Sequence, residues 1–158
     1  MTGTSTCLLF ETQAEEAARF YVGVFQACGR PAALGAITRY PEGMQRPAGS
    51  VLTAHFTLDG QEFMALNGPQ VAFTPAVSLF VSCADQAELD AFWARLTEGG
   101  QPSVCGWLTD RFGLSWQVAP AAVMAMLQDP DPARAGRVLQ AVMGMTKLDL
   151  AALRKAYG

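Results

Sequence analysis

Apolar and polar residues alternate over several short stretches of the chain, and a period of two residues is typical of β-strands. The alternation predicts strands over residues 6–11, 33–40, 51–58, 62–66, 77–83 and 114–119. Asp59-Gly60 separates two of these strands and favours a tight hairpin, because both residues tolerate a positive φ. The chain therefore starts as a series of short, closely connected strands.

A helical period, with apolar residues three and four apart, follows the first and the fifth of these strands. Thr12 with Glu15, and Asp85 with Glu88, have the spacing of a capping box, in which two side chains satisfy the first amides of a helix. Glycines follow both periodic stretches and predict where the helices end. We expect one amphipathic helix after each of the two strands.

The order of strand, helix and further strands thus occurs twice. With an offset of 72 residues, the first helix falls on the second, and Thr6 falls opposite Ser78. The matched helical residues are Glu16, Phe20 and Tyr21 with Glu88, Phe92 and Trp93. We interpret this as an internal duplication of βαβββ-like modules, about residues 1–70 and 71–120, in one α+β domain.

Residues 121–158 have a different character. A short helical stretch follows Pro120, and Asp131 can cap a next helix that has Pro132 at its first position. A last helix is predicted to start near Asp149 and to end near Tyr157. This C-terminal helical extension is too short to hold a core of its own.

Sorting the strands by alternation separates a uniformly apolar face from a mixed one. The apolar set is Leu52, Ala54, Phe56, Leu58, Met64, Leu66, Val77, Leu79, Val81, Leu114, Trp116 and Val118. The mixed set is Thr53, His55, Thr57, Phe63, Ala65, Asn67, Ser78, Phe80, Ser115 and Gln117. We expect helices to cover the first face, and the second face to line a small-molecule cavity. A half-solvated antiparallel sheet is the alternative that the alternation leaves open.

Composition narrows the function classes. Charged residues make up 16% of the chain, which is below the usual share and indicates that part of the surface is covered in a homodimer. The net charge is −3 with scattered basic residues, which argues against nucleic-acid binding. No apolar run reaches the length of a membrane span, and the N-terminus lacks the pattern of a signal peptide, so a cytoplasmic protein is expected. The four cysteines form no CxxC pair, and we expect reduced thiols.

Several segments in the same order resemble PhnB-like proteins, which are labelled as a 3-demethylubiquinone-9 3-methyltransferase domain and belong to the vicinal oxygen chelate superfamily. These segments are AEEAARFY (14–21), LDGQEFMALNG (58–68), FTPAVS (73–78), GWLTDRFGLSWQ (106–117) and MTKLDLAAL (145–153). The resemblance implies paired βαβββ modules of the glyoxalase/bleomycin-resistance type, each curling a sheet around a cavity, in a dimer.

Metal-dependent members of that superfamily carry His and Glu ligands on the cavity strands. The resemblance places those positions at Thr6, Ala65, Ser78 and Gln117, and none of these residues is a histidine or a carboxylate. Divalent metals of this kind need imidazole and carboxylate ligands, so we expect no catalytic metal and no cofactor there. His55 is the only histidine, and a structural role for it is favoured over a catalytic one.

The leading hypothesis is a metal-free homodimer that binds a small organic molecule. The predicted cavity contacts are His55, Phe63, Asn67, Ser78, Trp107 and Gln117, with Asp110 and Arg111 at the cavity mouth. One alternative is an isomerase, lyase or dioxygenase with a metal at His55 and a carboxylate such as Glu62. The family label adds methyl transfer, although no glycine-rich turn follows a strand here. A drug-sequestering protein is the third possibility.

Overall fold

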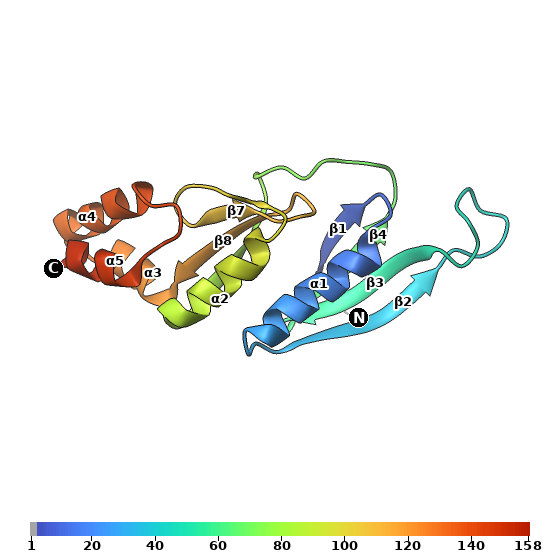
Figure 1. Cartoon of the computed structure of the whole chain (residues 1–158), viewed down its shortest axis with the longest axis horizontal. Coiled ribbons are helices and arrows are strands. Elements are labelled where there is room, and N and C mark those ends of the chain that lie inside the picture. Colours follow the sequence, from blue (N-terminus) through green and yellow to red (C-terminus); the bar gives the residue numbers. More distant parts are fainter. Residues whose placement is uncertain (1–2) are drawn as a thin grey trace. The chain divides into compact units, whose positions relative to one another are not determined.

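The computed structural model describes residues 3–158, which form two compact units that divide between Ala72 and Phe73 (Figure 1). Each unit contains one four-stranded sheet and one helix that packs on it. In the described part of the chain, no helix combines the length and the apolar character that crossing a membrane requires.

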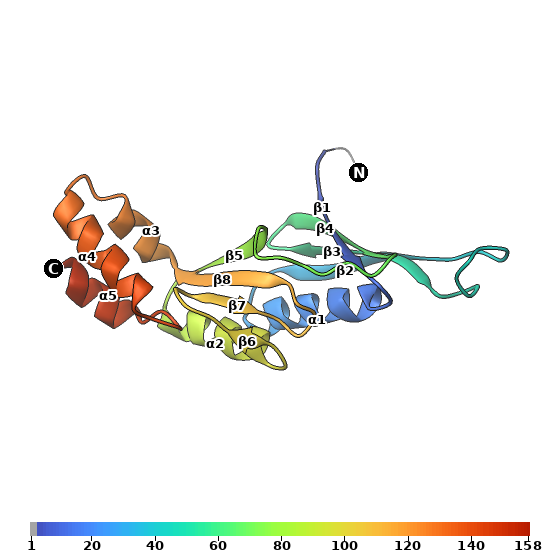
Figure 2. The same ribbon diagram turned by 90° about the horizontal axis from the view of Figure 1, so that it is seen from above.

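The first unit has the strand order β1-β4-β3-β2, with β1 parallel to β4 and the other neighbours antiparallel. Its elements are β1 (Thr6–Phe10), α1 (Ala14–Ala27), β2 (Ala32–Arg39), β3 (Val51–Leu58) and β4 (Gln61–Asn67). Helix α1 lies on one side of this sheet (Figure 2). The predicted hairpin at Asp59-Gly60 is confirmed, because both residues have a positive φ.

The second unit repeats this arrangement with the order β5-β8-β7-β6. Its elements are β5 (Ser78–Cys83), α2 (Gln86–Thr97), β6 (Gln101–Pro102), β7 (Trp107–Thr109) and β8 (Ser115–Pro120), followed by α3 (Ala121–Leu127), α4 (Pro132–Met143) and α5 (Leu150–Tyr157). Strand β5 is parallel to β8, as β1 is to β4. The prediction of an α+β fold of two βαβββ-like modules with a C-terminal helical extension is therefore confirmed.

The three last helices belong to the second compact unit. Asp131 caps α4 as predicted, because its carboxylate accepts from the Ala133 amide at 2.9 Å. The Tyr157 hydroxyl donates to the Asp129 carboxylate. This hydrogen bond lowers the pKa of Asp129 and raises the pKa of Tyr157.

The strand registers correct the offset of the duplication. Met64 and Gln117 each lie four residues after a glycine with positive φ and occupy equivalent places on β4 and β8. Cys7 pairs with Met64, and Phe80 pairs with Gln117, so the first strands of the two modules match with an offset of 73 rather than 72. Thr6 is therefore not the equivalent of Ser78.

The two helices begin in different ways. Helix α2 has the predicted capping box, since Asp85 accepts from the Glu88 amide at 2.9 Å and Glu88 accepts from the Ala84 amide at 2.6 Å. The box predicted for α1 was wrong, because no side chain at its N-cap makes a capping bond. Asn67, at the end of β4, accepts from the Ala14 amide at 2.9 Å instead. A residue distant in sequence thus starts the first helix.

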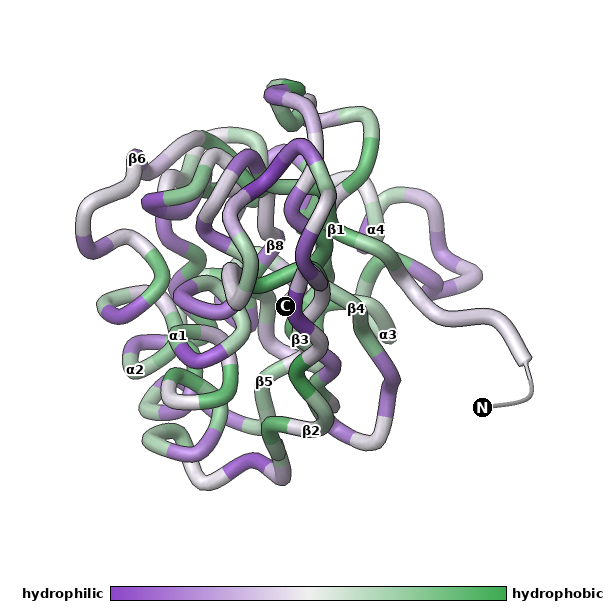
Figure 3. Tube along the Cα trace, turned by 90° about the vertical axis from the view of Figure 1, so that its right-hand side faces the viewer, coloured by the Kyte–Doolittle hydropathy of each residue, from purple (hydrophilic) through white to green (hydrophobic). Residues whose placement is uncertain are grey.

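Both cores lie between a helix and the sheet of the same unit. Tyr21 of α1 packs against Phe56, which stacks on Phe63 with ring centroids 5.1 Å apart. In the second unit, Phe92 of α2 and Trp116 of β8 are fully buried. Hydrophobic and hydrophilic residues alternate along both helices (Figure 3), as the helical period predicted.

Replacing Asn67 tests the long-range cap. We expect Asn67→Ala to lower the free energy of unfolding by about 2 kcal/mol, because it removes a helix cap and a buried hydrogen bond to the Val51 carbonyl. Urea denaturation and amide exchange at the start of α1 measure the loss. Thr12→Ala is the matched control and should change stability by less than about 0.5 kcal/mol. Equal effects of the two substitutions would contradict the assignment.

Candidate functional site

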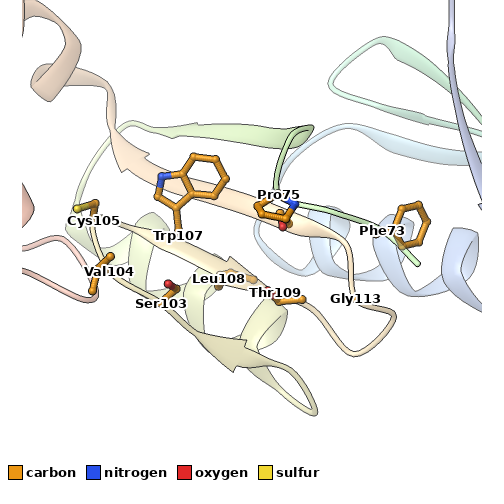
Figure 4. Close-up of a pocket in the computed structure, with 10 residues that line it drawn as sticks. Phe73, Pro75, Ser103, Val104, Cys105, Trp107, Leu108, Thr109 and Gly113 are labelled. Carbon is orange, nitrogen blue, oxygen red and sulfur yellow. The ribbon is translucent and has the colours of Figure 1, made fainter. Parts of the chain in front are cut away.

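The second unit contains a pocket of about 510 Å³. It is lined by Phe73, Pro75, Ser103, Val104, Cys105, Trp107, Leu108, Thr109, Gly113 and Ser115. The segment before β5, the turn between β6 and β7, strands β7 and β8, and the turn between these two strands contribute these residues. In Figure 4 the Trp107 indole stands up from β7, and Pro75 and Phe73 lie on the segment that leads into β5. The pocket therefore lies on the sheet face that α2 leaves uncovered.

The lining combines aromatic, apolar and hydroxyl groups. Trp107 and Phe73 supply aromatic rings, while Ser103, Thr109 and Ser115 supply hydroxyl groups. None of the described residues that line the pocket carries an Asp, Glu, Lys, Arg or His side chain. A lining of this kind offers stacking and neutral hydrogen bonds, and it offers no partner for a charged ligand.

Ser78 and Gln117 lie on this same face of the sheet, beside the pocket. The Gln117 amide donates to the Ser78 hydroxyl at 2.9 Å, and Gln117 pairs with Trp107 across β7 and β8. Both side chains are half-buried and neutral. Both are neutral groups, whereas imidazole, thiolate and carboxylate are the side chains that bind divalent transition metals well.

Asp110 was predicted at the cavity mouth, and the structure places it in the core. The side chain is 3% exposed, and its carboxylate accepts from the Phe112 amide at 2.8 Å, the Leu114 amide at 3.1 Å and the Trp116 indole at 2.8 Å. Ionised carboxylates make strong hydrogen bonds with such donors. Asp110 therefore fixes the turn before β8 and the position of the Trp116 ring.

Arg111 was also predicted at the mouth, and it lies at the C-terminal end of α2 instead. Its guanidinium donates to the Glu98 carbonyl at 3.3 Å and lies 3.9 Å from the Glu98 carboxylate. Its Cβ is within 3.3 Å of the position that a Cβ on Gly99 would take. Arg111 thus contacts the helix that covers the opposite face of the sheet.

The predicted faces of β1 and β4 require a correction. Ala65 is buried on the α1 side of β4 and Asn67 is the buried helix cap, so neither lines an open face. Phe63 is buried on the same side, but it lines the same first-unit pocket as His55. Thr6 shares the α1 side of β1 with the buried Leu8. The open face of β4 carries Met64 and Leu66 instead, because a shift of one residue exchanges the two faces of a strand.

His55 lies on the open face of β3, as its alternation predicted. It lines a separate pocket of about 370 Å³ in the first unit, together with Glu62 and residues of β2. Its Nδ1 is buried and has no hydrogen-bond partner within the described chain. Among residues 3–158, no three His, Cys, Asp or Glu side chains gather closely enough to hold a metal ion.

The C-terminal segment supports one wall of the second-unit pocket. The Cys105 amide donates to the Met145 carbonyl at 2.7 Å, and the Gly106 amide donates to the Thr146 carbonyl at 2.8 Å. Gly106 has a φ of 79°, and a Cβ there would lie 3.1 Å from the Leu148 side chain. Only glycine combines that backbone conformation with so close an approach.

Side chains fasten the same segment to α2. The Gln86 amide donates to the Leu148 carbonyl at 3.1 Å, and its oxygen accepts from the Leu150 amide at 2.8 Å. Lys147 lies 2.6 Å from the Asp90 carboxylate, and this hydrogen bond lowers the pKa of Asp90. We call residues 145–150 the strap.

Sequence reasoning missed the strap and most of the pocket lining, since Trp107 is the one predicted cavity contact among the lining residues. Ser103, Val104 and Cys105 occupy a turn with no periodicity, and Phe73 and Pro75 belong to an irregular segment. Thr109 was detectable in principle, because it lies two residues after Trp107 and faces the same side of β7.

Solved structures with a similar fold include the fosfomycin resistance protein FosX from Mesorhizobium loti. It is 14% identical with a TM-score of 0.52, and the match covers 77% of this chain and 92% of that chain. A protein from Pseudomonas aeruginosa is 20% identical with a TM-score of 0.61, over 76% of this chain and 98% of that one. The fold is that of the vicinal oxygen chelate superfamily, which includes the glyoxalase/bleomycin-resistance proteins.

The relationship is closer to a PhnB protein from Bacillus cereus. That chain is 35% identical with a TM-score of 0.66, and the match covers 75% of this chain and 99% of that chain. The model of the family described as 3-demethylubiquinone-9 3-methyltransferase matches residues 2–119. The chain therefore belongs to this PhnB-like family. The search of the curated proteins found no match.

Substituting Asp110 tests its structural role. We expect Asp110→Ala to lower the free energy of unfolding by about 3–5 kcal/mol, because two buried donors and one part-buried donor lose their acceptor. Asp110→Asn keeps one acceptor oxygen and should cost clearly less. Urea denaturation followed by tryptophan fluorescence measures both. If the alanine variant were as stable as the parent protein, the turn would not depend on this carboxylate.

Substituting Leu148 tests the strap. Leu148 is 2% exposed, and Leu148→Ala should cost about 2–4 kcal/mol and accelerate amide exchange at Cys105 and Gly106. Leu139→Ala on α4 is the control, since Leu139 is 49% exposed and should leave that exchange unchanged. Unchanged exchange in the Leu148 variant would show that the strap does not hold the pocket wall.

Proposed function

We propose that this PhnB-like protein is a small-molecule-binding homodimer of the cytoplasm whose second-unit pocket takes a neutral ligand with an aromatic ring. The observation that supports the proposal is a 510 Å³ pocket with Trp107 on one wall and uncharged hydrogen-bonding groups around it. Pockets of this size suit small organic molecules. The indole gives a planar ring a large surface on which to stack.

The neutral character of the ligand follows from the desolvation cost of charge. A carboxylate or phosphonate transferred into this pocket would lose water and gain no cationic partner among its described lining residues. Hydroxyl and carbonyl groups, in contrast, match Ser103, Thr109 and Ser115. The ligand class is therefore a neutral aromatic compound with a few polar substituents.

The side chains that line the pocket favour binding of a ligand over its chemical conversion. Cys105 supplies the only titratable side chain among the described residues of the lining, and general acid–base catalysis needs a poised acid or base. Ser78 and Gln117, the positions where metal-dependent relatives carry ligands, are a neutral hydroxyl and a neutral amide that are hydrogen-bonded to each other. We therefore place sequestration of a compound ahead of isomerase, lyase, dioxygenase or methyltransferase chemistry.

The proposal of a homodimer is based on exposed apolar residues of the second unit. Val77, Phe80 and Val104 are large and exposed, and Phe80 shares the open face with Gln117. The low charged fraction of the chain is consistent with a covered surface of this kind. Sedimentation of the parent protein and of Phe80→Asp measures the association directly.

A matched pair of ligands tests the pocket. We expect 2-naphthol to bind and to quench tryptophan fluorescence, and 2-naphthalenesulfonate to bind at least about tenfold more weakly, because its charge has no partner. Trp107→Ala should weaken 2-naphthol binding by about tenfold or more, since one aromatic stacking contact contributes about 1 kcal/mol beyond its buried area.

Trp93→Phe is the control, because Trp93 lies on α2 and does not line the pocket. It should bind 2-naphthol like the parent protein. Equal binding of the neutral and the anionic compound, or equal loss in both tryptophan variants, would reject the proposal. Consumption of the bound compound over time would replace sequestration by an enzymatic function.

A further inference from the structure

One row across the first sheet contains three side chains that bind soft metal ions. Cys7 of β1 pairs with Met64 of β4, and Met64 pairs with His55 of β3. The residues on either side of each one face α1, while these three side chains lie on the open face. Directly paired residues on neighbouring strands have side chains about 5 Å apart. Thiol, thioether and imidazole therefore stand side by side in one line.

We propose that Cys7, Met64 and His55 form a binding site for a soft monovalent cation of the copper(I) class. Thiolate and thioether sulfur select such ions over harder ones, and imidazole is an accepted third ligand. The ion would lie above Met64, the middle residue, with the outer two side chains leaning inward. Binding replaces the thiol proton of Cys7, which passes to solvent, and involves no electron transfer.

The surroundings of each ligand are consistent with this role. Cys7 is an unpaired, exposed cysteine, so an ion can reach it from solvent.

His55 supplies the second argument. Its buried Nδ1 has no hydrogen-bond partner in the described chain, and an unsatisfied buried polar atom costs free energy. The imidazole ring is therefore not already committed to a structural hydrogen bond.

The row is poorly suited to hard divalent cations. Magnesium and calcium need several oxygen ligands, and zinc prefers four ligands drawn from thiolate, imidazole and carboxylate. Glu62 lines the pocket next to His55, and no third His, Cys, Asp or Glu in residues 3–158 completes a group with them. The site is distinct from the second-unit pocket and does not rest on the proposed function.

Copper(I) titration against a chromophoric chelator tests the site in the full-length protein. We expect one ion to bind with high affinity, Cys7→Ser to weaken binding by at least about 100-fold, and Met64→Leu and His55→Gln to weaken it by about tenfold each. Zinc(II) and magnesium(II) should not compete. Silver(I), which has no redox chemistry under these conditions, should shift the imidazole signals of His55, the only histidine in the chain, in NMR spectra.

The other thiols require a control, because any exposed cysteine can bind silver or copper. Cys28→Ser with Cys105→Ser is the matched background, and it should keep the high-affinity ion and the His55 shift. Binding that survives in Met64→Leu and His55→Gln with unchanged affinity would reduce the site to a single thiol and overturn the proposal. Loss of the high-affinity ion in the Cys28/Cys105 background would do the same.

Discussion

The buried Asp110 carboxylate determines how the second module presents its open face. Its oxygens accept from two turn amides and from the indole of Trp116, so the turn geometry and the ring position are set together. Once Trp116 points towards α2, alternation along β8 leaves Ser115 and Gln117 on the other side. The composition of the pocket beside them thus depends on a residue that does not touch a ligand.

The sequence predicted the elements well because their signals are local. Helical period, the capping box at Asp85 and the hairpin dipeptide Asp59-Gly60 each act over a few residues, and the resemblance to PhnB-like proteins supplied the pairing of the modules. The correct face of β8 followed from its polar residues. In β4, however, Phe63 and Ala65 are as apolar as Met64 and Leu66. A period of two residues predicts that the two faces of a strand alternate, but it does not predict which face is covered by a helix. In β4, the packing of α1 determines which face is covered.

The other wrong predictions concern polar residues whose hydrogen-bond partners could not be predicted from the sequence. Asn67 and Asp110 are polar residues near the ends of the sheets. At such positions the sequence does not distinguish a residue that contacts a ligand from one that makes a structural hydrogen bond. The structure separates the two roles by burial, since both side chains are covered and bonded to backbone amides. The pocket residues Ser103 and Cys105 had no signal, because an irregular turn acquires its position from the segment that holds it.

The two modules carry different residues at equivalent positions of their sheets. The equivalent positions Met64 and Gln117 carry a thioether in one sheet and an amide in the other, and each has neighbours of matching chemistry: Cys7 and His55 in the first sheet, Ser78 and Trp107 in the second. The same arrangement of strands thus carries two surfaces of different chemistry.

Through the strap, the C-terminal helices affect the position of the pocket wall, although they are distant from that wall in sequence. The amides of Cys105 and Gly106 are hydrogen-bonded to the carbonyls of Met145 and Thr146. The position of the pocket wall therefore depends on the segment between α4 and α5. Substitutions in those helices can reshape the pocket while every lining residue stays the same. Relatives with identical lining residues and different tails would then differ in the shape of the pocket, and a comparison restricted to lining residues would miss the reason.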